Sequence, residues 1–175
     1  IPREKIKVYG IPIDPKFADN VDANAVKGRL GLDAKRPTVL IMGGGQGLGP
    51  IAELVNELNR ASSPPQMIVV AGSNKRLFDW LEKRKRSLGA TTVVYGFTPE
   101  IAELMSVSTL IVTKPGGLTI SEALSKRLPI IILNPIPGQE AKNTEYLLSE
   151  GAAVKADNAA DAALLTDMLL GNRSK

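Results

Sequence analysis

The chain contains no cysteine, no histidine and few aromatic residues, and each absence removes a class of function. Without cysteine there can be no disulfide, thiol nucleophile or thiolate metal site. Without histidine the commonest general base and zinc ligand are missing, so neither a Ser-His-Asp hydrolase nor a zinc enzyme is expected from this chain alone. Aromatic residues make up only 4% of the chain, which is too few for a platform that stacks single-stranded nucleic acid, and no nucleic-acid partner is expected.

Long apolar runs and a signal-peptide pattern are also missing. No run approaches the ~20 residues that span a bilayer, and residues 1–10 carry charges, which favours a cytoplasmic setting. The chain begins with Ile1 rather than Met, so we expect a piece of a longer protein. Its 175 residues, 43% hydrophobic, suit one soluble globular domain. The net charge of +4 suits a phosphate-bearing ligand or an anionic membrane surface.

Short apolar runs alternate with amphipathic stretches along the chain. The predicted strands cover residues 38–42, 67–71, 92–95, 109–112, 129–133 and 152–154. The predicted helices cover residues 51–58, 77–88, about 99–105, about 118–124, about 140–149 and 157–170, with Thr98 as the cap of the third and Pro99 as its first residue. Continuous apolar strands separated by helices predict an α/β fold, a Rossmann-like, doubly wound parallel sheet of about six strands with helices on both faces.

Glycine-rich segments follow five of these strands, at the edge of the sheet where such folds bind ligands. They are residues 43–49, 72, 96, 116–117 and 138. Backbone N–H groups of the first segment can cradle a phosphate, although a tight strand–helix turn would look the same. The dinucleotide pattern fails because its last glycine would be Leu48 or Pro50, and the P-loop fails because Pro50 follows Gly49. Neither NAD nor a P-loop nucleotide site is therefore predicted.

Two further segments carry polar groups to the same edge. Residues 114–122 run from a strand into a helix, and Glu122 is predicted in about the first turn. There its carboxylate could accept both hydroxyls of a ribose, or could simply complement the helix dipole. Residues 134–140 form a rigid segment whose amide and carboxylate groups suit sugar hydroxyls, although a loop with a helix cap is the plainer interpretation.

A basic stretch forms the last candidate site. Residues 83–86 are all Lys or Arg, and Lys75, Arg76 and Trp80 precede them in the sequence. These side chains could contact anionic lipid headgroups, or could form an ordinary solvated helix face.

The combination of segments is more specific than any one of them. Residues 42–47, 95–97, 113–122 and 135–140, followed by Asn143, occur in an order that resembles the C-terminal domain of family-28 glycosyltransferases of the GT-B fold. The resemblance is greatest to diacylglycerol glucosyltransferases and monogalactosyldiacylglycerol synthases, and it runs from Tyr9 to about residue 154. It implies an interdomain linker and domain start at residues 1–20 and a UDP-sugar donor-binding domain at residues 21–175.

The resemblance also implies roles for single residues. The uracil would lie on the backbone of Gly96, Phe97 and Thr98, and the ribose on Glu122. The diphosphate would contact Gly44, Gly45, Gln46, Gly47, Leu118 and Thr119, and the sugar would contact Gln139, Glu140 and Asn143. The reaction implied is transfer of a hexose from UDP to a lipid acceptor, diacylglycerol, with no metal and no cofactor besides the donor substrate. The catalytic base is expected in an N-terminal domain that is absent here, so this chain is expected to bind nucleotide without transferring sugar.

Two alternatives remain open. One is an enzyme similar to UDP-N-acetylglucosamine 2-epimerases, which would use the same UDP contacts. The other is a non-catalytic nucleotide-binding module. A lipid acceptor would place the protein in the cytoplasm, peripherally on the inner face of the cell membrane.

Overall fold

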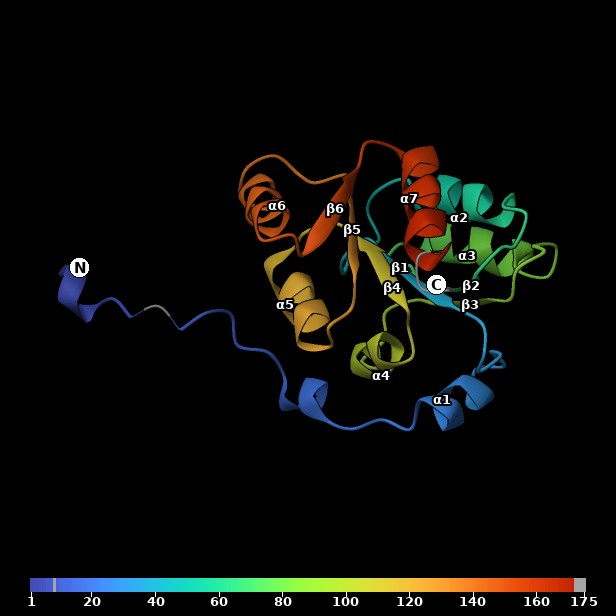
Figure 1. The fold of residues 1–175 in the computed structure, drawn as a ribbon, viewed down its shortest axis with the longest axis horizontal. Helices are drawn as coiled ribbons and strands as arrows, with labels where there is room; N and C mark the ends of the chain where they lie inside the picture. Colours follow the sequence, from blue (N-terminus) through green and yellow to red (C-terminus); the bar gives the residue numbers. More distant parts are fainter. Residues whose placement is uncertain (8, 172–175) are drawn as a thin grey trace.

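The computed structural model describes residues 1–7 and 9–171, and a six-stranded sheet forms its centre (Figure 1). The strands are β1 (Thr38–Met42), β2 (Gln66–Val70), β3 (Thr92–Tyr95), β4 (Leu110–Thr113), β5 (Ile130–Leu133) and β6 (Ala153–Ala156). Their order is β3-β2-β1-β4-β5-β6, and every neighbouring pair is parallel. The predicted parallel sheet and its number of strands are confirmed.

Helices cover both faces of the sheet, because successive strand residues point to opposite faces and both sets are apolar. Leu40 and Met42 of β1 belong to one core, while Val39 and Ile41 belong to the other. The first core is covered by α1 (Ala23–Arg29), α4 (Ile101–Ser106), α5 (Gly117–Ser125) and α6 (Gln139–Ser149). The second is covered by α2 (Ile51–Asn59), α3 (Lys75–Arg84) and α7 (Ala159–Gly171) (Figure 1).

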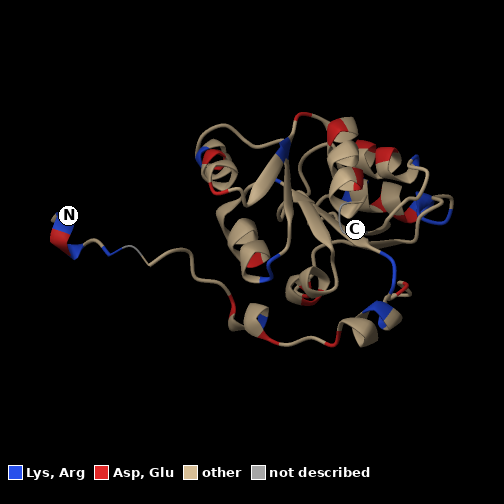
Figure 2. Ribbon diagram, viewed as in Figure 1, with Lys and Arg blue, Asp and Glu red and all other residues tan. Residues whose placement is uncertain are grey.

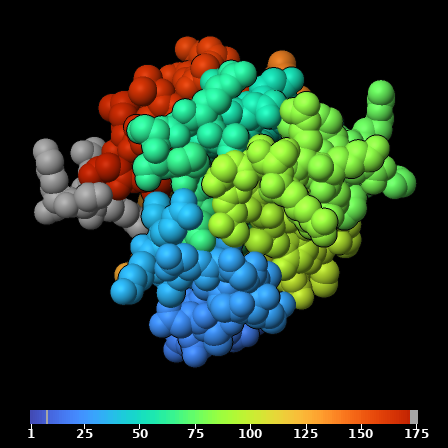
Figure 3. All heavy atoms as spheres, turned by 90° about the vertical axis from the view of Figure 1, so that its right-hand side faces the viewer, coloured from blue at the N-terminus to red at the C-terminus, as the bar shows by residue number. Residues whose placement is uncertain are grey.

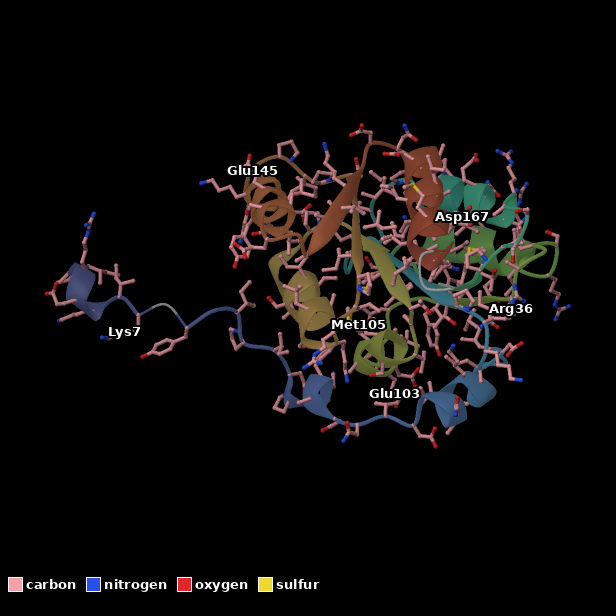
Figure 4. All side chains as sticks on the ribbon, in the orientation of Figure 1. Lys7, Arg36, Glu103, Met105, Glu145 and Asp167 are labelled. Atoms are coloured by element: carbon pink, nitrogen blue, oxygen red, sulfur yellow. The ribbon has the colours of Figure 1, made fainter. Side chains whose placement is uncertain are left out.

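The segment before β1 packs against α4, and no helix was predicted there. Phe17, in the short 3-10 helix η2 (Pro15–Ala18), is 3% exposed within the first core. Asp22 caps α1 by accepting hydrogen bonds from two backbone N–H groups. Arg29 of α1 pairs with Glu103 of α4, which is labelled in Figure 4. Figure 3 shows the same segment, in blue, packed against the yellow-green part of the chain. The other 3-10 helix, η1 (Arg3–Lys5), lies away from the sheet (Figure 1).

Most helix ends lie within two residues of the prediction, and local hydrogen bonds account for two of the differences. Helix α3 ends at Arg84 rather than residue 88, because the Ser87 hydroxyl donates to the Arg84 carbonyl and closes a turn. Helix α4 begins at Ile101 with Glu100 as its N-cap, so the prediction that Thr98 caps it was wrong. The Thr98 hydroxyl oxygen accepts from the Glu100 N–H at 3.2 Å and closes a turn just before the helix.

Candidate functional site

Five loops line the edge formed by the carboxyl ends of the strands, and each contains one of the predicted glycine segments. In the order of the sheet they follow β3 (residues 96–98), β2 (71–74), β1 (43–49), β4 (114–116) and β5 (134–138). The direction of the strand order reverses between β1 and β4, which is the point where open α/β sheets bind ligands. The glycine segments therefore gather around one candidate site, as predicted.

The loop after β1 offers a group of unused backbone donors. The N–H groups of Gly44, Gly45 and Gln46 donate no hydrogen bond within the part of the chain that the structure describes. The loop is closed by the Leu48 N–H, which donates to the Gly43 carbonyl at 3.0 Å. Adjacent backbone N–H groups held in such a turn bind anions.

Contacts with the loop after β2 hold these donors in place. The Ser73 N–H donates to the Gly45 carbonyl at 2.9 Å, and the Asn74 side-chain amide donates to the Gly47 carbonyl at 3.2 Å. Gly72 has a positive φ of 57°, and a Cβ at this position would overlap the Gly45 carbonyl oxygen. Only glycine permits this close approach of the two loops.

The start of α5 adds a second group of donors from the neighbouring strand, β4. Its N-cap is Gly116, which offers no side-chain acceptor. The N–H groups of Leu118 and Thr119 have no partner among the described residues. By contrast, the Asn74 side chain caps α3 and accepts from the Leu77 N–H at 3.0 Å. The start of α5 thus keeps its partial positive charge available to a ligand.

Glu122 lies in the second turn of α5, because the helix begins at Gly117. It lies just beyond the first turn, so the alternative that it only complements the helix dipole does not explain this residue. Its carboxylate is partly buried and accepts no hydrogen bond within the described residues. Burial raises the pKa of Glu122, while nearby Lys16 lowers it and Asp14 raises it. A desolvated carboxylate without a donor can accept hydrogen bonds from ligand hydroxyls.

The loop after β3 presents free main-chain groups. The N–H and C=O groups of Phe97 form no hydrogen bond with any other described residue, and the residue is 80% exposed. Beside this loop is a hollow of about 310 Å³ lined by Gly72, Ser73, Lys75, Phe78 and Gly96. One N–H donor and one C=O acceptor next to a hollow can pair with the edge of a planar heterocycle.

The first turns of α6, which follow the loop after β5, are fixed to the loop after β4 by an ion pair and a hydrogen bond. Glu140 Oε1 lies 2.6 Å from Lys114 Nζ, with the two side chains 14% and 19% exposed. Asn143 donates through its side-chain amide to the Pro115 carbonyl at 2.9 Å. Gln139, by contrast, is exposed at the start of α6. Lys114 was not predicted as a site residue, since only its place in the 113–122 run pointed to it.

The predicted site residues therefore lie along one edge of the sheet. They follow the end of β3, then the ends of β1 and β4, and then the end of β5. Four inter-strand spacings of about 4.8 Å separate β3 from β5, a span of about 19 Å that suits an extended ligand. Within the described residues, no group of three or more His, Cys, Asp or Glu side chains could hold a metal ion. No helix in that part of the chain is both long and apolar enough to cross a membrane.

Comparison with known proteins decides the family. Residues 38–167 match the model described as the glycosyltransferase family 28 C-terminal domain. The chain belongs to this family. The resemblance that the sequence motifs indicated is thereby confirmed, and the matched residues include all the strands and the loops after them.

Curated relatives of this family 28 domain include two glycerolipid enzymes. The chain is 35% identical over 170 residues to the "Processive diacylglycerol beta-glucosyltransferase" of Staphylococcus carnosus, covering 96% of the chain and 43% of the relative. It is 38% identical over 155 residues to the chloroplastic "Monogalactosyldiacylglycerol synthase" of Spinacia oleracea, covering 84% of the chain and 29% of the relative. The chain therefore spans less than half the length of these relatives.

Solved glycosyltransferases share the fold of this family 28 domain. The crystal structure of Medicago truncatula UGT71G1 complexed with UDP-glucose superposes with a TM-score of 0.61 and 20% identity, over 92% of this chain and 37% of that one. At this identity the likeness concerns the fold alone. The chain has the Rossmann-like α/β architecture of GT-B glycosyltransferases.

Proposed function

We propose that this chain is the UDP-sugar-binding domain of a glycosyltransferase that transfers a hexose to a lipid acceptor, diacylglycerol. Residues 1–20 connect it to the rest of the enzyme and begin the domain, and residues 21–175 bind the donor. The donor is a substrate, and the proposal includes no metal and no further cofactor.

The two groups of unused N–H donors on β1 and β4 carry this proposal. Donors at Gly44, Gly45 and Gln46 belong to the loop after β1, and those at Leu118 and Thr119 to the helix after β4. Because β1 and β4 are adjacent, both groups border the same point of the sheet edge. Fixed N–H groups of this kind stabilise negative charge that develops on a leaving diphosphate.

The remaining groups bind the parts of the same ligand that lie on either side of the diphosphate. The carboxylate of Glu122 accepts hydrogen bonds from the ribose hydroxyls, for which it has no competing donor among the described residues. The free N–H and C=O of Phe97, between Gly96 and Thr98, pair with the uracil edge. The exposed Gln139 at the start of α6 contacts the sugar, at the other end of the site.

In the reaction, the bond from the sugar's anomeric carbon to the β-phosphate oxygen breaks, and a bond from that carbon to the acceptor hydroxyl oxygen forms. UDP leaves with the negative charge, and a base takes the acceptor proton. The base and the acceptor site belong to the part of the enzyme outside this chain, which spans only 43% of its staphylococcal relative. The names of the relatives support diacylglycerol as the acceptor.

A lipid acceptor requires the enzyme to reach a membrane, and the basic end of α3 is suited to an anionic one. Lys83, Arg84 and Arg86 are exposed there, and the Arg84 guanidinium lies 4.9 Å from the centre of the Trp80 ring. Figure 2 shows basic residues gathered at this end of α3. We include peripheral binding to the inner face of the cell membrane in the proposal.

Calorimetric titration with UDP tests the donor site directly. The chain should bind UDP, and Glu122→Ala should bind roughly tenfold or more weakly, because a charged hydrogen bond contributes about 1.5–3 kcal/mol. Glu145→Ala is a matched control, since Glu145 is exposed in the middle of α6 (Figure 4), and it should leave the affinity unchanged. Binding of NAD in place of UDP, or equal UDP affinity of the Glu122 variant and wild type, would contradict the proposal.

A further inference from the structure

The only basic side chain in the loops after β1, β4 and β5 belongs to Lys114. It follows β4 at the point where the strand order reverses, next to the proposed diphosphate site. Its surroundings are more specific than those of a surface lysine, because its side chain is only 19% exposed. A cation at this position can interact with the negative charge of a bound diphosphate.

The stem of Lys114 lies against the glycine loop. A Cβ at Gly44 would be 2.8 Å from Lys114 Cε and 3.6 Å from Nζ. The ammonium therefore sits beside Gly44, the first of three consecutive residues, 44–46, whose N–H groups have no partner in the described chain. An ammonium has three N–H donors, and here one is used by Glu140. The rest are available to an anion that enters the loop.

Glu140 is fully engaged in holding this arrangement. Its Oε1 accepts from Lys114 Nζ at 2.6 Å, and its Oε2 accepts from the Ile136 N–H at 2.9 Å. The carboxylate thus fixes both the lysine and the loop after β5. Without Lys114, this mostly buried negative charge would stand beside the diphosphate and repel it.

We propose that the Lys114 ammonium binds the diphosphate of the donor, and that Glu140 is a positioning residue that acts on the donor through Lys114. This inference deepens the proposed function and rests on it. It assigns a cation that the sequence motifs did not single out. It also gives Glu140 a role other than direct binding of the sugar.

The test compares uridine and UDP on the 175-residue chain by calorimetry. Wild type should prefer UDP. Lys114→Met should weaken UDP binding at least about tenfold and leave uridine binding within about twofold. The variant should also show a smaller loss of UDP affinity between low and high salt, because a screened charge has been removed. Lys114→Arg should recover most of the UDP affinity.

The double variant Lys114→Met/Glu140→Gln separates binding from folding. The double variant leaves no unpaired carboxylate. If Lys114 served only to neutralise Glu140, UDP affinity would therefore recover in the double variant. If Lys114 contacts the diphosphate, the double variant stays as weak as Lys114→Met. Recovery would overturn the inference, as would a single variant that binds UDP like wild type. If wild type binds neither uridine nor UDP, the proposed function itself fails.

Discussion

The side-chain amide of Asn143 donates a hydrogen bond of 2.9 Å to the main-chain carbonyl of Pro115. It joins the first turns of α6 to the loop that leads into α5, although the two residues are far apart in the sequence. The same helix and loop are joined a second time by Lys114 and Glu140. The edge of the sheet is therefore held together in this region by side chains as well as by β4–β5 pairing.

Replacing Asn143 by alanine should lower the free energy of unfolding by about 1 kcal/mol, because a partly buried carbonyl loses its donor. Urea denaturation followed by circular dichroism measures this as a lower midpoint with an unchanged slope. Glu145→Ala, two residues away on the same helix, should stay within about 0.5 kcal/mol of wild type. Equal stability of the two variants would show that the Pro115 contact contributes nothing.

Replacing Gly72 by alanine should be much more damaging. The residue has φ 57°, and the new methyl group would overlap the Gly45 carbonyl that the Ser73 N–H binds. We expect a loss of about 2 kcal/mol or more and weaker UDP binding, because the glycine loop must shift.

A matched change at Gly28 should have the opposite sign. This glycine lies in α1, and a Cβ there would meet no atom within 4 Å. Alanine should therefore stabilise the protein by roughly 0.5–1 kcal/mol through helix propensity. Thermal unfolding of both variants checks the pair, and a neutral Gly72→Ala would contradict the described loop contact.

The strands were predictable because they are short, mostly apolar runs, as in Val39–Ile41, and a glycine segment follows five of the six. Helix α1 was missed because it has only seven residues and buries little more than Val26, so no apolar periodicity marks it. Its cap, Asp22, is one acid among 18 in the chain.

The candidate site was predictable to the level of its loops. Their order along the edge depends on β1 lying between β2 and β4, and strand order is a property of the whole sheet. Lys114 was missed for a similar reason. It is one of 22 basic residues, and its partner Glu140 lies 26 residues away in the sequence. Only the fold brings the pair together.

Glu122 should cost the folded protein stability at neutral pH. Burial raises its pKa above the usual 4.5. Lys16 lowers this pKa and Asp14 raises it, but burial has the largest effect. The folded state thus holds this proton more strongly than the unfolded state, so the free energy of unfolding falls as the pH rises from 4.5 to the raised pKa. Above the raised pKa the loss is complete.

Glu122→Gln should therefore be more stable than wild type at about pH 7, and the difference should shrink below about pH 4. The same variant should bind UDP more weakly at neutral pH, because an amide is a poorer acceptor than a carboxylate. Denaturation at both pH values, with Glu145→Gln as the control, measures the first effect. A variant less stable than wild type at neutral pH would mean that the carboxylate has a partner in the folded protein.

The basic end of α3 should govern binding to anionic vesicles. Each basic side chain near such a surface contributes about 1 kcal/mol, so changing Lys83, Arg84 and Arg86 to Gln should weaken partitioning on the order of a hundredfold. Co-sedimentation with phosphatidylglycerol vesicles, compared with phosphatidylcholine vesicles, measures this. The control changes three exposed basic residues elsewhere in the chain to Gln: Arg127, Lys142 and Lys155. It loses the same net charge, so equal effects of the two triple variants would mean that net charge, and not this end of α3, governs binding.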